Sequence, residues 1–158
     1  MSAATVVLAA PEQKSLMFGL LSAYLTELGT PSAPYPYLPL YWREPERFPY
    51  VIVAGVEIVG FALVRQVGVA SEFEMAEFYV VPGHRRAGIG RSAARELFAK
   101  HRGTWRVDAA PSNVQAQAFW ASVVPAHICS VTDTRFVFQY EEALVVSEQR
   151  LKPPRRLQ

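Results

Sequence analysis

Residues 85–90 have the composition of an anion-binding turn. They read Arg-Arg-Ala-Gly-Ile-Gly and stand between an apolar, β-prone run and a segment with helical periodicity. Glycines remove side chains that would block a close approach to the backbone, and the first amides of a helix have no partner within it. These amides and the helix dipole attract anions such as phosphate. The sequence therefore predicts a phosphate site around Gly88 and Gly90.

Positive charge is concentrated next to this turn. Between His84 and Arg106 there are seven Lys or Arg residues and a single acid, Glu96, although the net charge of the whole chain is only +2. This local excess favours a ligand with several phosphates. The turn lacks the Lys-Ser/Thr of a nucleotide-hydrolysing P-loop, and it departs from the dinucleotide fingerprint with its three glycines at fixed offsets.

Glu77 is the strongest candidate for a general base. It lies in the otherwise apolar, β-prone run over 73–81, where burial would raise the pKa of a carboxyl group towards a useful range. Glu74 and His84 are the alternative bases. An ion-paired strand residue is the structural alternative for Glu77.

The elements that must position these residues are predicted in the order strand, helix, irregular segment, three strands, helix, strand, helix and two strands. Hydrophobic periodicity and turn residues predict strands over 5–8, 50–54, 56–67, 73–81, 105–109, 128–131 and 135–140. Helices are predicted from Pro11 to a stop at Gly29, over 88–100, and from a capping box formed by Ser112 and Gln115. This order indicates a mixed α/β domain with a central sheet.

Each predicted helix has an expected apolar face. The three faces comprise Leu16, Leu20, Tyr24 and Leu28; Ile89, Ala93, Leu97 and Phe98; and Val114, Ala118 and Ala121. Between the first helix and the second strand, residues 30–49 hold six prolines and cannot form a long regular helix. Four aromatic residues of this segment could line a pocket for an acceptor or serve in packing: Tyr35, Tyr37, Tyr41 and Trp42.

Length and composition limit the number of domains and the kinds of ligand and partner. A chain of 158 residues with 51% apolar residues can bury the core of one domain, which we place at 1–145, followed by a basic, flexible tail at 146–158. Its one cysteine, Cys129, excludes an internal disulfide and a zinc site of several thiolates, which favours a cytoplasmic location. We expect no metal, no membrane span and no nucleic-acid partner, since no His/Asp/Glu spacing, long apolar run or aromatic stacking platform points to them.

The turn and its context resemble the GNAT superfamily of acyl-CoA-dependent N-acyltransferases. Residues 85–90 match the motif Arg/Gln-x-x-Gly-x-Gly/Ala after a strand that ends in Val80-Val81-Pro82. Asn113, Ala116 and Phe119-Trp120 are similar to the family's Asn-x-x-Ala-x-x-Leu-Tyr segment. The strings YPYLPLYWREPERFPYVI, EMAEFYV and AFW resemble more narrowly a branch of bacterial predicted acetyltransferases without an assigned substrate.

The resemblance implies a fold and a ligand. The fold would be a mixed, mostly antiparallel sheet of about six or seven strands, with splayed central strands and helices on both faces. Acetyl-CoA would be the co-substrate: its pantetheine arm would lie along Val80 and Val81, and Asn113 would reach the pantetheine or acetyl end. The pyrophosphate would rest on the turn formed by Arg85, Arg86, Ala87, Gly88, Ile89, Gly90 and Arg91.

The implied activity is direct transfer of an acetyl group to a primary amine of a small molecule or protein. The sequence departs from the family at Trp120, where many members have a Tyr that protonates the departing thiolate, and an indole cannot act as an acid at neutral pH. We therefore assign no general acid. The alternative function is a non-catalytic acyl-CoA sensor or partner-binding module. Cys129 as an acyl carrier lacks an evident His partner, and a homodimer is compatible with the family.

Overall fold

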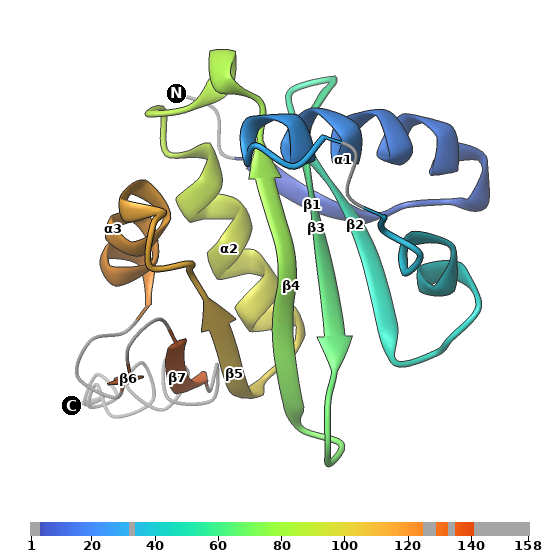
Figure 1. Ribbon diagram of the computed structural model, residues 1–158. Helices are drawn as coiled ribbons and strands as arrows, with labels where there is room; N and C mark the ends of the chain where they lie inside the picture. The colour runs from blue at the N-terminus through green and yellow to red at the C-terminus, as the bar shows by residue number, and fades with distance from the viewer. Residues whose placement is uncertain (1–3, 32–33, 125–128, 133–134, 141–158) are drawn as a thin grey trace, which may run out of the picture.

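One mixed sheet organises the molecule. The computed structural model describes residues 4–31, 34–124, 129–132 and 135–140, and within them seven strands pair in the order β1-β2-β3-β4-β5-β7-β6 (Figure 1). The strands are β1 (Ala4–Leu8), β2 (Arg47–Ala54), β3 (Glu57–Gln66), β4 (Glu72–Val80), β5 (Gly103–Asp108), β6 (Cys129–Thr132) and β7 (Arg135–Tyr140). The α-helices are α1 (Lys14–Glu27), α2 (Ile89–Lys100) and α3 (Val114–Val123), with short 3₁₀ turns η1 (Pro11–Gln13), η2 (Leu38–Trp42) and η3 (Pro82–His84).

The β4–β5 pair is the one parallel pair of this sheet, and α2 makes the crossover between the two strands. All other described pairs are antiparallel. The parallel pairing stops at Met75 opposite Val107, whereas β4 continues to Val80. Because β5 ends at Asp108, no strand of the described residues lies beside the rest of β4 on that side. The predicted splay of the central strands is therefore present.

Apolar side chains on the two faces of the sheet form two cores. One lies under α2 and α3 and includes the fully buried Phe98, Trp105 and Phe138. The other lies under α1 and η2 and includes Met17 and Phe61. Helices therefore cover both faces, as Figure 1 shows, and the predicted fold class is confirmed.

The buried faces of α1 and α3 differ from the predictions. In α1 the buried residues are Met17 and Leu21, while Leu16 and Leu28 are exposed. A strict four-residue repeat drifts around a helix of 3.6 residues per turn, so the predicted stripe leaves the contact with the sheet at both ends.

In α3 the predicted face of Val114, Ala118 and Ala121 is the exposed one. Trp120 and Val123 are buried instead, because the largest apolar side chains of a helix gain most from leaving water. The predicted Ser112 cap is also wrong. Asn113 caps α3 and accepts the Ala116 amide on Oδ1 at 3.1 Å.

Strand β2 begins at Arg47, before the predicted start at Tyr50, and so contains Pro49. The last residue of β1 pairs with Tyr50, so Pro49 lies beyond the end of β1. The ladder between β1 and β2 therefore needs no N–H at position 49, and the proline is tolerated. The carbonyl of Pro49 accepts the Ala9 amide at 2.9 Å.

Several sequence expectations concern residues beyond those described. The side chain of Cys129, the start of the strand predicted from Ile128, the boundary at 145 and the tail at 146–158 lie outside them. Among the helices of the described ranges, none has the length and apolar character needed to cross a membrane.

Candidate active site

A β-bulge in β4 determines where Glu77 points. Leu63 of β3 pairs with Glu77, but the next residue, Val64, pairs with Met75, so Ala76 is an extra residue in β4. Without it, the period of two would place Glu77 on the same face as Met75, in the core under α2 and α3. The bulge shifts Glu77 to the opposite face, under α1.

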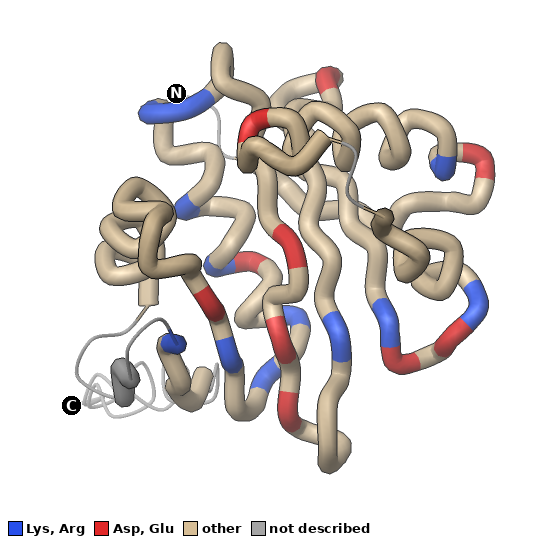
Figure 2. Tube along the Cα trace, viewed as in Figure 1, with Lys and Arg blue, Asp and Glu red and all other residues tan. Residues whose placement is uncertain are grey.

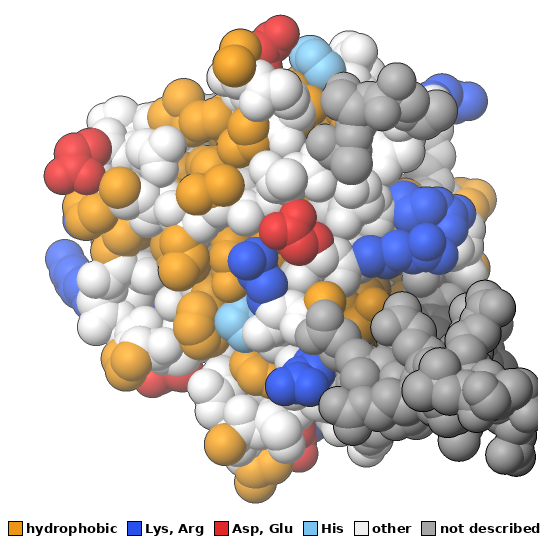
Figure 3. Space-filling model, turned by 180° about the vertical axis from the view of Figure 1, so that it is seen from behind, with side chains coloured by type: hydrophobic (Ala, Val, Ile, Leu, Met, Phe, Trp, Pro, Cys, Tyr) orange, Lys and Arg blue, Asp and Glu red, His pale blue; other side chains and the backbone are white. Residues whose placement is uncertain are grey.

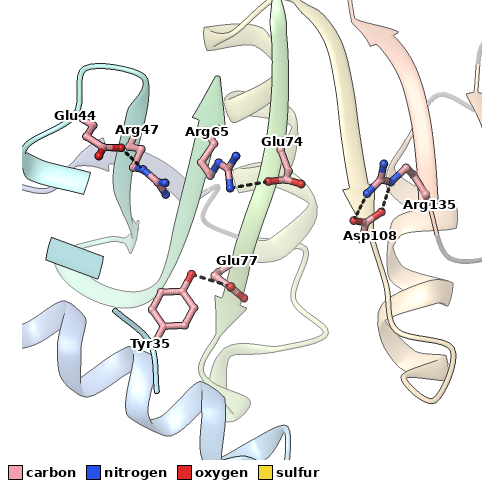
Figure 4. Close-up of polar contacts among 8 residues, drawn as sticks. All are labelled: Tyr35, Glu44, Arg47, Arg65, Glu74, Glu77, Asp108 and Arg135. Carbon is pink, nitrogen blue, oxygen red and sulfur yellow. Dashed lines mark hydrogen bonds and ion pairs between the residues drawn. The ribbon is translucent and has the colours of Figure 1, made fainter. Parts of the chain in front are cut away.

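Two tyrosines face Glu77 there. The Tyr35 hydroxyl donates a hydrogen bond of 2.8 Å to Oε2 of Glu77 (Figure 4). Burial raises the pKa of the Glu77 carboxyl group, and hydrogen bonding from Tyr24 and Tyr35 partly opposes that increase. Burial and the nearby carboxylate raise the pKa of Tyr35 above its ordinary value, so Tyr35 remains a donor at neutral pH.

Glu77 opens onto a cavity of about 210 Å³ between η2 and the sheet. Three of the four aromatic residues proposed for an acceptor pocket line it: Tyr35, Tyr37 and Tyr41. The charged lining residues are Arg47, Arg65, Glu74, Glu77 and Asp108. The structure thus brings the predicted base, its alternative Glu74 and three predicted acceptor residues together.

Trp42 does not belong to this group. Its Nε1 donates to the Ala9 carbonyl at 2.9 Å, Lys14 lies 5.5 Å from its ring, and it lines a separate cavity with Leu8 and Pro49. Tyr41 and Trp42 are adjacent in η2, but only Tyr41 lines the cavity that contains Glu77.

The unpaired edge of β4 exposes backbone groups beside Glu77. The Val81 amide donates to Val59 of β3 at 2.8 Å, and the Val81 carbonyl accepts the His84 amide at 3.0 Å. Both backbone groups of Val81 are therefore engaged. Since polar groups alternate sides along an antiparallel strand, the Val80 amide points away from β3, into the gap. Of the two valines predicted to hold pantetheine, only Val80 presents a donor there.

The turn before α2 has the backbone geometry of an open anion site. Gly88 is the N-cap of α2 with φ of +80°, and a Cβ atom there would meet nothing within 4 Å. Arg86 also has a positive φ, 65°. The Ser92 amide is the first to close a helical turn, onto Gly88 at 3.0 Å, so the preceding amides of Ile89, Gly90 and Arg91 have no helical partner. The structure thus brings these predicted anion donors together.

Gly90 has a packing role in addition. A Cβ atom at this position would lie 3.0 Å from the ring of Phe119. The absence of a side chain therefore allows α2 to approach α3 closely, and the need for glycine at position 90 does not by itself indicate a ligand.

Positive charge is less concentrated at this turn than the sequence suggests. Arg85 forms a bidentate pair with Glu27 of α1 at 2.7 and 2.8 Å, and its Nε donates to the Val80 carbonyl at 2.7 Å. Arg85 thus anchors the turn to the Val80 carbonyl, and its guanidinium group is directed towards Glu27 and away from the turn. Arg106 pairs with Glu72 at 2.9 Å.

The remaining basic residues are spread along α2 and its two ends, and the helix is about 18 Å long at 1.5 Å per residue. Lys100 pairs with Glu96 at 3.8 Å near the far end of the helix. Seen from behind, basic side chains lie in separate groups over this face (Figure 3). Among the described residues of this basic cluster, Arg86 and Arg91 are the two that lie next to the N-terminus of α2 without an ion-pair partner, so the predicted excess of charge is spread along the helix.

The other predicted site residues lie around the gap. Asn113 stands after β5 and before α3, with its Oδ1 occupied by the helix cap. Trp120, in the place of the family's tyrosine, is 5% exposed and packs edge-on against Phe78. The Nδ1 atom of His84 is buried without a hydrogen-bond partner among the described residues, and His84 does not line the cavity.

Sequence reasoning missed Tyr24, Arg47 and Arg65 as site residues. Tyr24 was assigned only to the apolar face of the first helix, and Arg47 stood at the end of an irregular segment. Arg65 offered a signal, because a charge inside a predicted strand of mostly apolar residues requires a partner. No group of three or more His, Cys, Asp or Glu side chains in the described ranges is placed to hold a metal ion.

Comparison with known proteins places this chain in a family. The model of the Acetyltransferase (GNAT) family matches residues 17–123, more than half of the chain. The chain therefore belongs to the GNAT family, and the prediction of an acyl-CoA-dependent acetyltransferase is confirmed at the level of the family. No curated protein matches the chain.

Solved structures share the fold. An acetyltransferase from Thermus thermophilus is 21% identical with a TM-score of 0.68, covering 89% of this chain and 100% of its own. The aminoglycoside acetyltransferase AAC(6')-Ib in complex with coenzyme A is 14% identical with a TM-score of 0.67, covering 92% and 99%. The PaiA N-acetyltransferase from Thermoplasma acidophilum in complex with coenzyme A is 14% identical with a TM-score of 0.61, covering 89% and 100%.

Proposed function

We propose that this protein transfers the acetyl group of acetyl-CoA directly to the primary amine of a small molecule, with Glu77 as the general base. One observation carries the proposal. Within β4, the bulge at Ala76 turns Glu77 into the cavity, while the following residues form the free edge of the gap beside β5. A single strand thereby supplies a proton acceptor for the amine and a wall for the acyl donor.

The residues of the gap and turn are suited to acetyl-CoA. Val80 would offer its amide to the pantetheine arm, and the amides of Gly88, Ile89, Gly90 and Arg91 would bind the pyrophosphate. The open space at Gly88 supports this assignment, because no side chain stands between these amides and a ligand. Acetyl-CoA, when bound, supplies the acetyl group in the activated form of a thioester.

The amine must lose a proton to become a nucleophile, and Glu77 is placed to accept it. Burial raises the pKa of its carboxyl group, which strengthens the carboxylate as a base. The Tyr35 hydroxyl holds the carboxylate in one orientation at 2.8 Å. Trp120 lies in the core and cannot donate a proton, so we assign no general acid.

Replacement of Glu77 tests the proposal. Glu77→Gln keeps the shape and the hydrogen bond from Tyr35 but cannot accept a proton. We expect kcat to fall by about 100-fold or more, measured as free thiol released from acetyl-CoA with a panel of amines. Calorimetry should give an unchanged Kd for CoA. Glu57→Gln, at an exposed acid at the start of β3, is the matched control and should retain activity. Unchanged turnover in Glu77→Gln would remove Glu77 from the mechanism.

A non-catalytic acyl-CoA-binding module is the second candidate function. The observation that favours it is Trp120, which replaces the tyrosine acid of the family with a buried core residue. Tight CoA binding by the wild-type protein without thiol release from any amine would support this alternative. The single cysteine in 158 residues supports a cytoplasmic location for either function.

A further inference from the structure

Two arginines face each other across neighbouring strands at the end of the cavity away from Glu77. Arg47 of β2 and Arg65 of β3 are direct cross-strand partners, and both line the cavity. Like charges placed directly opposite in an antiparallel pair destabilise it. The side chain of Arg47 is only 14% exposed, so water screens this repulsion weakly. The arrangement requires negative charge nearby.

The neighbouring acids satisfy the two guanidinium groups only in part. Glu44 accepts a hydrogen bond of 2.7 Å from Nε of Arg47, while Glu74 lies 3.7 Å from Arg65 (Figure 4). The second distance is longer than the 2.7–2.9 Å typical of a charge-assisted hydrogen bond. Each guanidinium has five N–H donors, so these contacts leave donors available to a ligand in the cavity.

The acids that line the cavity also differ in how completely they are paired with cations. Asp108 is held by Arg135 at 2.7 and 3.0 Å, and Glu74 lies beside Arg65 and across β4–β5 from Arg106. Figure 2 shows this row of charged positions crossing the sheet from β2 to β5. Within the described residues, Glu77 has tyrosine partners and no cationic one. Among the described residues, the cavity thus presents one carboxyl group without a cationic partner and, separately, two incompletely paired cations.

We infer that the acceptor is a small amine that also carries an anionic group, a carboxylate or a phosphate, and that this group binds between Arg47 and Arg65 while the amine faces Glu77. The inference rests on the function proposed above and specifies its substrate class. It also separates this protein from the aminoglycoside acetyltransferases that share its fold, because a polycationic acceptor would meet two arginines.

Dimensions limit the size of the acceptor. Glu77 pairs with Leu63 of β3, and Arg65 lies two residues further along that strand, which corresponds to about 7 Å. A molecule with only a few bonds between its amine and its anionic group matches this spacing.

Matched pairs of amines test the inference. β-Alanine is compared with propylamine, and O-phosphoethanolamine with ethanolamine, while spermidine serves as the polycation. For the wild-type protein we expect kcat/KM to be roughly 10- to 100-fold higher for an anionic member than for its partner, as for a charge-assisted hydrogen bond. The two pairs distinguish a carboxylate from a phosphate as the preferred group.

Variants test whether Arg47 and Arg65 cause the preference for anionic amines. Arg47→Gln and Arg65→Gln each relieve the like-charge contact, so both should fold, and each should lower the preference by about tenfold or more. Arg43→Gln, at an exposed arginine that does not line this cavity, should keep it. In addition, the preferred anionic amine should raise the melting temperature of the wild-type protein without acetyl-CoA, and that of the Arg47→Gln/Arg65→Gln variant less.

The outcomes separate the two proposals. Turnover with equal efficiency for both members of each pair, or a preference for spermidine, overturns this inference and leaves the proposed function standing. A preference that survives in Arg47→Gln and Arg65→Gln also overturns it. Binding of acetyl-CoA without thiol release from any amine overturns the proposed function and this inference together.

Discussion

Glu77 shows how one carboxyl group can be prepared for proton transfer by opposing influences. Burial raises its pKa, whereas hydrogen bonds from Tyr24 and Tyr35 lower it, with burial the larger influence. A higher pKa makes the carboxylate a stronger base but reduces the fraction that is deprotonated at a given pH. In the proposed mechanism, the tyrosines would therefore set both the orientation of the carboxyl group and the pH at which it becomes deprotonated.

Removal of the Tyr35 hydroxyl should move the pH dependence of the reaction. Tyr35→Phe deletes a hydrogen bond that favours the charged form of Glu77, so the pKa of Glu77 rises. Since the base acts when deprotonated, the acid limb of the kcat/KM profile should move to higher pH. Tyr37→Phe removes a hydroxyl that makes no hydrogen bond to Glu77 in the described structure and should leave the limb in place. An acid limb that does not move in Tyr35→Phe would contradict the role of Glu77 as the titrating base.

Gly88 allows steric and conformational effects to be separated at one residue. Its φ of +80° costs an L-residue about 1–2 kcal/mol, although a Cβ atom would meet nothing. Gly88→Ala should therefore lower the free energy of unfolding by about that amount and retain CoA binding. Gly88→Glu should abolish CoA binding in calorimetry, because the carboxylate covers the amides and repels phosphate. Retained affinity in Gly88→Glu would refute the assignment of the pyrophosphate site.

At the scale of elements, the turn before α2 is connected to α1. Arg85 lies on the turn, packs 5.5 Å from the Tyr79 ring, and joins the Val80 carbonyl to Glu27 near the end of α1. The same helix carries Tyr24, which faces Glu77. The helix that carries Tyr24 beside the Glu77 cavity and the turn before α2 are therefore in direct contact.

Breaking this connection should affect ligand binding more than stability. The Arg85–Glu27 pair is partly exposed, and such pairs contribute about 0–1 kcal/mol to stability. Arg85→Gln frees the turn, so the Kd for CoA should rise by roughly tenfold while the melting temperature changes little. Glu27→Gln breaks the same pair, and a double-mutant cycle should show that the two losses do not add. Additive losses would show that the pair does not act as one unit.

At the scale of the whole molecule, His101 joins the end of α2 to the sheet. Its Nε2 lies 2.7 Å from the Tyr50 hydroxyl of β2, and its ring packs against Phe48 and Phe73. Its carbonyl accepts Nε1 of Trp105 at 2.7 Å. Burial, with a smaller effect of Lys100, lowers the pKa of His101 from 6.5 to about 4. The folded protein therefore holds this histidine neutral.

This histidine makes stability depend on pH. Between the unfolded pKa of 6.5 and the folded pKa of about 4, the unfolded chain binds a proton that the native state does not. Stability should therefore fall as the pH decreases through this range, by about 3 kcal/mol at most. Urea denaturation at several pH values measures the effect. His101→Gln cannot titrate and should show a smaller loss than the wild type, whereas an equal loss would exclude His101 as its source.

Local sequence pattern accounts for the helices and strands and for the turn at Gly88. The strand from Arg135 to Tyr140 and the buried face of α2 agree with the prediction because their periodicity is strong and uninterrupted. The turn at Gly88 was also predictable, because a left-handed backbone strongly favours glycine whatever surrounds it. The sequence by itself thus determined the order of elements, the family and the position of the glycine turn before α2.

Only the tertiary structure decided which residues face one another. The extra residue at Ala76 changes the face of Glu77, and it follows from the register between β3 and β4, which no local pattern specifies. The opposition of Arg47 and Arg65 depends in the same way on the pairing of β2 with β3. Register is set by packing across the whole sheet, so the set of side chains that line the cavity beside Glu77 is decided only when distant segments are brought together.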